Sequence, residues 1–323
     1  MASIIGRQVE FGIGKETVRG TALTAAGKWI RKVTATILPK AQIVIDDTQR
    51  AVFEDAEGTR LTRTWYEGEL EGILHADVLG YLLMNLYGTV NSATATGAAK
   101  DHTFSMLQSP LHPSYTMFMK DGGVVQEKIS LGMVKELSIM AKTDDYVRFK
   151  SSFMGAVGSS NSDTPAYGTD YDFISKDITM KMASTSGGLS GATAIPVKEL
   201  NINWTQTLVP SFVFGAYTPS DINNTDHALE VEMTLDLSDT TYRALLQADT
   251  VNYLQITIQG TATIGVSSNP KLVLTLNKAQ VMEWDREGGA NELVQQKVKF
   301  KGLYNATDGK MSSAVLTNLT SAY

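Results

Sequence analysis

Two stretches of the chain alternate strictly between apolar and polar residues and then change to a helical pattern. In residues 63–87, three glutamates alternate with leucine and glycine, and from Asp77 onward the leucines recur at helical spacing. Residues 229–248 repeat this order, with Ser238 and Asp239 at the change of pattern. A period of two is typical of a strand with one buried and one solvated face. Each stretch is therefore predicted to be a strand that leads directly into a short amphipathic helix, the first capped by Asp77.

The two stretches also correspond residue by residue, and flanking segments correspond in the same order. The anchors of the match are Val33 on Leu200 (offset 167), Glu67 on Glu230 (offset 163) and Val134 on Val281 (offset 147). Each drop in the offset marks a shorter loop in the second copy. An internal repeat of this length predicts a duplicated domain.

The segment poorest in apolar residues lies between the two copies. We expect a first domain at 1–157 with an N-terminal arm, a linker at 158–169, and a second domain at 170–323 with a C-terminal arm. Residues 39–61 and 209–226 are long excursions placed alike in the two copies, and we interpret each as an extended hairpin. Connections of this length usually carry a function.

Composition narrows the class of protein. Hydrophobic residues make up 43% of the 323 positions and charged residues 19%, which together with the many alternating runs predicts a mainly β chain. The net charge of −6 argues against a surface that grips nucleic acid, and the lack of cysteine excludes disulfides and thiol chemistry. No apolar run is long enough for a signal peptide or a membrane span, so we expect folding in a cytoplasm.

Candidate chemistry is sparse. The four histidines show no metal-ligand spacing, so we expect neither a metal site nor a cofactor. Glu69 and Glu71 could form the carboxylate pair of a glycosidase, but residues two apart on a strand face lie about 7 Å apart, whereas a retaining enzyme needs about 5 Å. A Glu-x-Glu pair recurs at Glu230 and Glu232. Repetition favours a shared surface over a catalytic pair, and we expect no catalytic residue.

Several short motifs resemble those of the tail tube (major tail) proteins of long, flexible-tailed bacteriophages. They are GIGKE at 12–16, GTA at 20–22, KWI at 28–30, EGEL at 67–70, DxxGYLL at 77–83, HTF at 102–104 and PSYT at 113–116. The resemblance covers residues 9–155 directly and reaches the second half only through the internal repeat.

The resemblance implies a fold and a function. The fold is a sandwich of two antiparallel sheets with a short flanking helix, and the inner strands of neighbouring subunits join into one β-barrel. Rings stack through a long hairpin and terminal arms into a tube that conducts DNA and houses the tape-measure protein. Tail-tip and terminator proteins are the further expected partners, DNA passes without specific binding, and the protein is a component of the virion tail assembled in the host cytoplasm.

The internal repeat adds an expectation about the ring. Two tandem copies of the tail-tube-like domain would build from three chains the ring that single domains build from six. We therefore expect a homotrimeric, pseudo-hexameric ring. If the second half decorates the outside instead, the ring is a hexamer.

Candidate site residues follow from the same resemblance. The residues expected to line the lumen, giving it a negative charge, are Glu67, Glu69, Glu71, Glu230, Glu232 and Asp236. The residues expected at contacts between rings or subunits are Ile43, Val44, Ile45, Phe53, Phe212, Val213, Phe214 and Tyr217.

Two other functions compete with the tube. One is a soluble surface- or carbohydrate-binding double β-sandwich, such as a decoration protein, which would expose an aromatic groove and stay monomeric. Its candidate aromatics are Trp29, Trp65, Trp204 and Trp284. The other is a glycosidase-like enzyme that uses Glu69 and Glu71.

Overall fold

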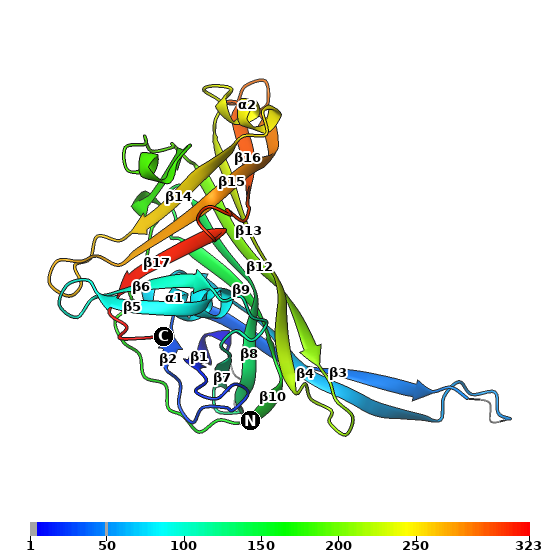
Figure 1. Cartoon of the computed structure of the whole chain (residues 1–323). Coiled ribbons are helices and arrows are strands. Elements are labelled where there is room, and N and C mark those ends of the chain that lie inside the picture. Colours follow the sequence, from blue (N-terminus) through cyan, green and yellow to red (C-terminus); the bar gives the residue numbers. More distant parts are fainter. Residues whose placement is uncertain (1–4, 49–50) are drawn as a thin grey trace.

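The computed structural model describes residues 5–48 and 51–323. This part of the chain is mainly β and all its strand pairings are antiparallel, which confirms the expected fold class (Figure 1). It contains two α-helices, α1 (Ala76–Tyr87) and α2 (Thr241–Gln247), and three short 3-10 turns, η1 (Gly6–Gln8), η2 (Ser175–Asp177) and η3 (Ser186–Leu189). No helix in the described ranges is long and apolar enough to cross a membrane.

Eight strands from both halves of the chain form one continuous sheet, which we call the main sheet. Its order is β3 (Val33–Asp46), β4 (Gly58–Ile73), β9 (Arg148–Gly155), β8 (Val125–Lys142), β12 (Glu199–Ser211), β13 (Asp221–Asp236), β16 (Gln295–Gly302) and β15 (Lys271–Glu287). The first four strands belong to the first half of the chain and the last four to the second. The pairing of β8 with β12 joins the two halves.

Two outer sheets pack against the main sheet. The first contains β2 (Lys28–Ile30), β1 (Val9–Lys15), β7 (Tyr115–Asp121), the beginning of β8 and β10 (Val157–Ser160). The second contains β11 (Ile178–Ala183), β14 (Val251–Gln259), the beginning of β15, β17 (Ser312–Asn318), β6 (Lys100–Met106) and β5 (Gly88–Thr94). Because β8 and β15 are long, each starts in an outer sheet and ends in the main sheet.

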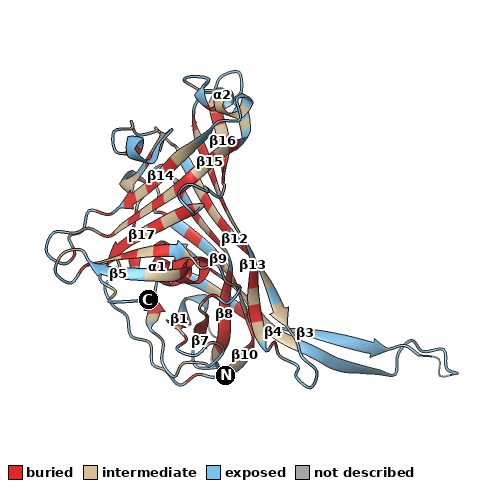
Figure 2. Ribbon diagram, viewed as in Figure 1, coloured by how far each residue is buried: buried red, intermediate tan, exposed pale blue. Residues whose placement is uncertain are grey.

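The main hydrophobic core lies between these layers and includes residues of both halves (Figure 2). Helix α1 lies inside it, and of its residues only Asp77 is not buried. The C-terminal residue, Tyr323, covers the helix: its ring lies 5.1 Å from that of Tyr81. A Cβ atom at Gly80 would lie 1.9 Å from the Tyr323 ring, so glycine is required at this contact.

The strand order of the first half recurs in the second. In the first half, the β3–β4 hairpin leads into α1 and is followed in the main sheet by β9 and then β8. In the second half, the β12–β13 hairpin leads into α2 and is followed by β16 and then β15. Two β-bulges recur as well. One lies between Gln42 and Ile43 and between Thr207 and Leu208; the other lies after Val134 and after Val281.

An equivalent threonine hydrogen bond spans the first bulge in both halves. The Thr62 hydroxyl donates to the Gln42 carbonyl at 2.9 Å, and the Thr225 hydroxyl donates to the Thr207 carbonyl at 3.2 Å. The two threonines keep the offset of 163, but Gln42 and Thr207 are 165 apart, not 167. Ala35 therefore corresponds to Leu200, where Val33 was expected. Bulges tend to be retained within families, because removing one shifts a whole strand.

Local details differ from the sequence-based expectation at the first helix. The N-cap of α1 is His75, and Asp77 lies in the first turn, where its carboxylate pairs with Lys28 at 3.0 Å. Asp77 is therefore a first-turn residue and not the N-cap.

Three segments expected to be arms or a linker are packed onto the sheets. Residues 9–15 form β1, and the C-terminal stretch forms β17 between β15 and β6. The linker segment begins with β10 and then runs along the first half, where Asp163 accepts from the Trp29 indole at 3.0 Å. Asp170, the first residue of the expected second domain, pairs with Arg31 of the first half at 3.2 Å.

Candidate functional site

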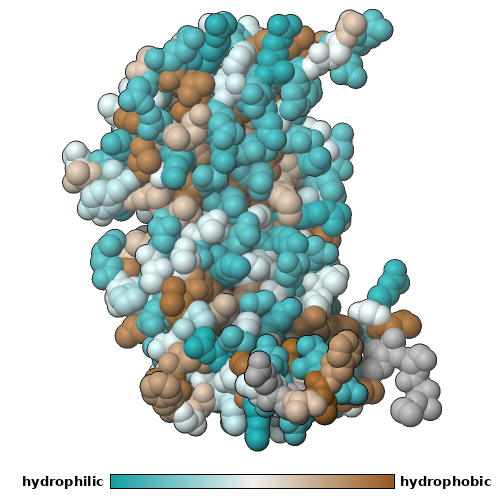
Figure 3. Space-filling view, turned by 90° about the vertical axis from the view of Figure 1, so that its right-hand side faces the viewer, coloured by the Kyte–Doolittle hydropathy of each residue, from teal (hydrophilic) through white to brown (hydrophobic). Residues whose placement is uncertain are grey.

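The side of the main sheet that faces away from the core, here called the open face, carries the six predicted carboxylates. Glu67, Glu69 and Glu71 lie in a row along β4, and Glu230, Glu232 and Asp236 lie along β13. Their sequence neighbours, such as Leu70 and Val231, are buried on the core side. Figure 3 views the molecule from the side on which the β3–β4 hairpin projects, and hydrophilic residues cover much of its upper and middle part.

Lysines on the neighbouring strands pair with these carboxylates. Lys150 of β9 lies 2.9 Å from Glu69, Lys297 of β16 lies 3.0 Å from Glu232, and Lys299 lies 3.1 Å from Glu230. Hydrogen bonds to their partner carboxylates raise the pKa of all three lysines. The open face is therefore not the purely acidic surface expected from β4 and β13 alone. The alternation Lys297-x-Lys299-x-Lys301 was a visible signal that the sequence-based interpretation missed.

The carboxylates expected for an enzyme lie in an unsuitable setting. Glu69 and Glu71 are exposed on the open face, and Glu69 is bound to Lys150. The proton-donating carboxylate of a glycosidase is normally desolvated, as in a hydrophobic pocket.

The four tryptophans do not form an exposed groove. Trp29 and Trp204 are buried, and Trp65 and Trp284 are half-buried. Each indole nitrogen donates a hydrogen bond: the acceptors are Asp163, Tyr87, Glu67 and Gln296. A carbohydrate-stacking surface built from these residues is not favoured.

Two hairpins project from the same end of the main sheet and carry the predicted contact residues. The β3–β4 hairpin extends far beyond the body (Figure 1) and exposes Ile43, Val44, Ile45 and Phe53. The shorter β12–β13 hairpin exposes Val213, Phe214 and Tyr217, while Phe212 is half-buried. Phe53 and Phe214 are as exposed as in an extended chain, at 105% and 108%. Apolar clusters of this kind mark interaction surfaces.

The shorter hairpin lies against the base of the longer one. The Thr64 amide donates to the Tyr217 carbonyl at 2.7 Å. The Phe212 ring lies 6.4 Å from that of Trp65, and the Arg63 guanidinium stands over it at 4.6 Å. These contacts fix the direction in which both hairpins leave the body.

The main sheet ends in two strands with an open edge. In the described ranges, β3 pairs only with β4, and residues 281–287 of β15 pair only with β16. The equivalent strands β12 and β8 pair with each other at the centre of the sheet, over residues 199–205 and 136–142. Open edges invite pairing with another chain. The pairing of β8 with β12 at the centre of the sheet is therefore equivalent to a pairing that β15 and β3, at the two edges, do not make within one chain.

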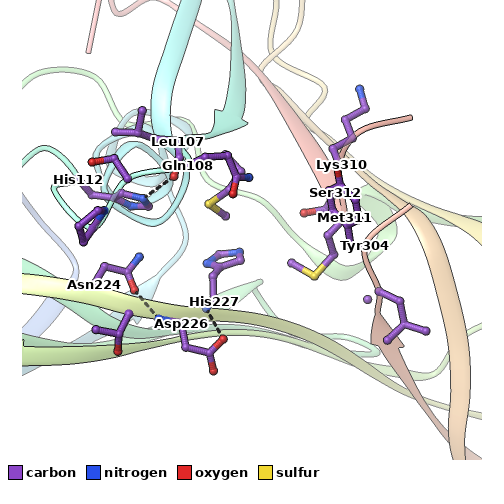
Figure 4. A pocket seen from close by; sticks show the side chains of 16 residues that line it. Leu107, Gln108, His112, Asn224, Asp226, His227, Tyr304, Lys310, Met311 and Ser312 are labelled. Atoms are coloured by element: carbon purple, nitrogen blue, oxygen red, sulfur yellow. Dashed lines mark hydrogen bonds between the residues drawn. The ribbon is translucent and has the colours of Figure 1, made fainter. Parts of the chain in front are cut away.

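A cavity of roughly 730 Å3 lies between the two halves, next to β13 and the loop before β7 (Figure 4). His112 and His227 contribute to its lining. Burial lowers the pKa of His227 to about 4, and His112 acts in the same direction. Both ring nitrogens of His227 are buried without a hydrogen-bond partner in the described part of the chain. A neutral imidazole fits this lining, and no group of three metal-ligating side chains occurs among the described residues.

Comparison with known proteins places these features in context. The family model described as "Phage tail tube protein" matches residues 6–302. None of the curated proteins matches the chain.

Two solved structures match part of the chain at low similarity. One is the cryo-electron microscopy structure of the anti-feeding prophage baseplate, 6-fold symmetrised, with 10% identity and a TM-score of 0.27 over 42% of this chain and 91% of that one. The other is the crystal structure of Hcp protein, with 13% identity and a TM-score of 0.23 over 42% of this chain and 96% of that one.

Proposed function

Because the chain belongs to the phage tail tube protein family, we propose that its rings stack into a hollow tube that conducts DNA and houses the tape-measure protein. Membership confirms the resemblance drawn from the sequence motifs, and it makes the chain a structural component of a phage tail. The role is architectural, not catalytic. The tape-measure, tail-tip and terminator proteins remain its proposed partners.

The observation that carries the proposal is the continuous main sheet. Each half supplies four strands in the same order, and β8 and β12 join them without a break. This continuity favours a second half that forms part of the tube wall over one that decorates its outside. Three copies of eight strands would close a barrel of 24 strands, so we propose a homotrimeric ring with pseudo-six-fold symmetry and retain two domains joined near 158–169. In this ring the open face lines the lumen.

The internal junction supplies the register of the contact between chains. β8 corresponds to β15 at an offset of 147, and β12 corresponds to β3 at 165. Transferring the pairing of β8 and β12 places Lys40 of one copy opposite Glu283 of the next, and Thr36 opposite Glu287. A lysine directly opposite a glutamate stabilises an antiparallel pair. This pairing would remove both open edges of the chain.

The exposed hairpins serve the stacking of rings. They project from one end of the sheet, and their apolar residues would be buried against the neighbouring ring. A surface patch of this kind is costly for a monomer in water and is explained by a partner.

Cysteine cross-linking tests the ring, since the chain itself contains no cysteine. Thr36→Cys combined with Glu287→Cys should give covalent trimers under oxidising conditions, because opposed Cβ atoms in a sheet lie about 5 Å apart. Met140→Cys with Asn201→Cys is the matched internal control and should form a bond within one chain. Thr36→Cys with Arg286→Cys points the thiols to opposite faces and should not cross-link.

Electron microscopy of the concentrated protein gives the symmetry. End-on rings with three-fold density and six similar lobes would support the trimer, and cross-linked products should stop at three chains. Six-fold rings with cross-linked products up to six chains would replace it with the hexamer. Folded monomers without either product would contradict the tube and favour the surface-binding sandwich.

A further inference from the structure

The lysine row of β16 lies between two acidic rows on the open face. Lys299 is opposite Glu232 on β13 and opposite Glu283 on β15, and Lys297 is opposite Asp285. The side chains of Lys297 and Lys299 also bond diagonally to Glu232 and Glu230. Each of these two lysines therefore has carboxylates on both sides.

The first half repeats this arrangement in a weaker form. Lys150 on β9 bonds to Glu69 on β4, and Glu136 on β8 acts on it from the other side. The order acid, base, acid thus follows the same strands in both halves. The second half differs in carrying three lysines on alternate positions of one strand, namely Lys297, Lys299 and Lys301.

An unpaired lysine row on a sheet face is a suitable contact for duplex DNA. Alternate residues of a strand lie about 7 Å apart, so neighbouring ammonium groups of such a row would face successive phosphates. Binding of this kind is driven by release of the counterions of DNA, and each free lysine contributes to it. A lysine that is already paired with a carboxylate contributes little to DNA binding, because the carboxylate already neutralises its charge.

We propose that Lys297 and Lys299 form a latent contact for the phosphate backbone of duplex DNA, kept silent by the carboxylates of β13 and β15. The open face then neither holds nor strongly repels a moving polyanion. This differs from a uniformly negative wall, which would exclude DNA from the surface. The inference rests on the proposed function, because it explains how a lumen lined by the open face passes DNA.

The test measures binding of duplex DNA to the purified, soluble chain by fluorescence anisotropy over a range of salt. Glu230→Gln with Glu232→Gln should bind at least about tenfold more tightly than the unchanged chain at low salt, and its affinity should fall with salt with a slope of about −2. Glu67→Gln with Glu71→Gln is the matched control: it removes the same charge from the same face but frees no lysine bonded in the structure. It should gain much less.

A rescue experiment separates unmasking from net charge. Adding Lys297→Gln and Lys299→Gln to the Glu230→Gln, Glu232→Gln variant should abolish the gained affinity. Equal gains in both double-Gln variants, or no gain in either with folding retained by circular dichroism, would overturn the inference. Since the assay needs no ring, such a result would leave the cross-linking test of the tube unaffected.

Discussion

The two halves of the chain share a strand order but differ in how their helices are covered. Helix α1 is buried between the main sheet, the β5–β6 hairpin and the C-terminal Tyr323. Helix α2 is shorter and buries only Tyr242. The first helix lies beside the junction of the two halves, whereas the second lies at the far end of the main sheet (Figure 1). In the proposed ring, that far end would lie at a contact with another copy.

A second difference concerns the outer sheets. The β5–β6 hairpin follows α1 in the first half and extends the outer sheet of the second half through β17. In the second half, only residues 248–250 separate α2 from β14. Strand β10 of the first half corresponds to β17 of the second. In the described ranges β10 pairs with β8 alone, whereas β17 pairs with both β15 and β6. The two halves of one chain are thus joined both in the main sheet and in an outer sheet, whereas two chains of the proposed ring would be joined in the main sheet alone. We therefore expect a ring to dissociate between chains first.

The largest expected effect comes from removing the longer hairpin, since no second-half element matches its length. Deletion of residues 43–57 should leave a folded, soluble chain that forms no tubes, because this hairpin lies outside the core and exposes its apolar residues. Electron microscopy for tubes and circular dichroism for folding would measure the two effects. Normal tubes from the deleted chain would contradict the stacking role. Deleting the shorter tip, residues 213–216, is a control that should weaken stacking less.

The next effect sharpens the comparison of the helices. Leu82 of α1 is fully buried, and its counterpart Leu245 of α2 is half-exposed. Leu82→Ala should lower the free energy of unfolding by about 3 kcal/mol, since it leaves a cavity in the core, and Leu245→Ala by about 1 kcal/mol. Denaturant unfolding of the soluble chain would measure both. Equal losses would mean that α2 is packed as tightly as α1 in the isolated chain.

Sequence patterns predicted those features of the fold that depend on residues close together in the chain. The alternation in β4 and β13, the change to a helix, and the two hairpins were all visible because burial on one face imposes a period of two. The repeat was visible for the same reason, although the first strands correspond at an offset of 165 and not 167: a shift of two residues keeps the same face buried and leaves the period of two unchanged. A bulge adds a residue without a composition signal, so only the strand register reveals it.

What could not be predicted depends on strands that are distant in sequence. That β9 and β16 lie beside the acidic strands follows from the sheet order, and this is what pairs Lys150 and Lys299 with carboxylates. The joining of β6 to β17 connects residues about 210 apart. The polar C-terminal stretch gave no sign that Tyr323 would enter the core.

An effect that depends on pH breaks the symmetry of the halves at one position. His227 of β13 corresponds to Thr64 of β4 at the offset of 163, and only the histidine titrates. Its pKa is lowered to about 4 by burial, so the unfolded chain binds its proton first as the pH falls. Stability should therefore be complete above about pH 6.5 and fall towards pH 4, by up to about 3 kcal/mol.

Melting temperatures of the unchanged chain and of His227→Gln between pH 4 and 7 test this expectation. The variant should lose part of the pH dependence and little stability at pH 7. His102, whose pKa burial also lowers, contributes in the same direction and would remain in both proteins. An unaltered pH profile in the variant would show that the His227 imidazole is accessible to protons in the folded chain.

The smallest expected effect tests whether the two bulges are equivalent. Thr62→Val and Thr225→Val each remove the hydroxyl that bonds across the bulge while keeping a β-branched side chain. Both threonines are exposed, so each substitution should lower the local stability by only about 0.5–1 kcal/mol. The neighbouring amides should then exchange their hydrogens a few-fold faster. Similar changes at both sites are expected if the halves descend from one domain and keep the bulge for the same physical reason. If only one site responds, the hydroxyl contact has a structural role in one half alone, and the correspondence then rests on strand order and register.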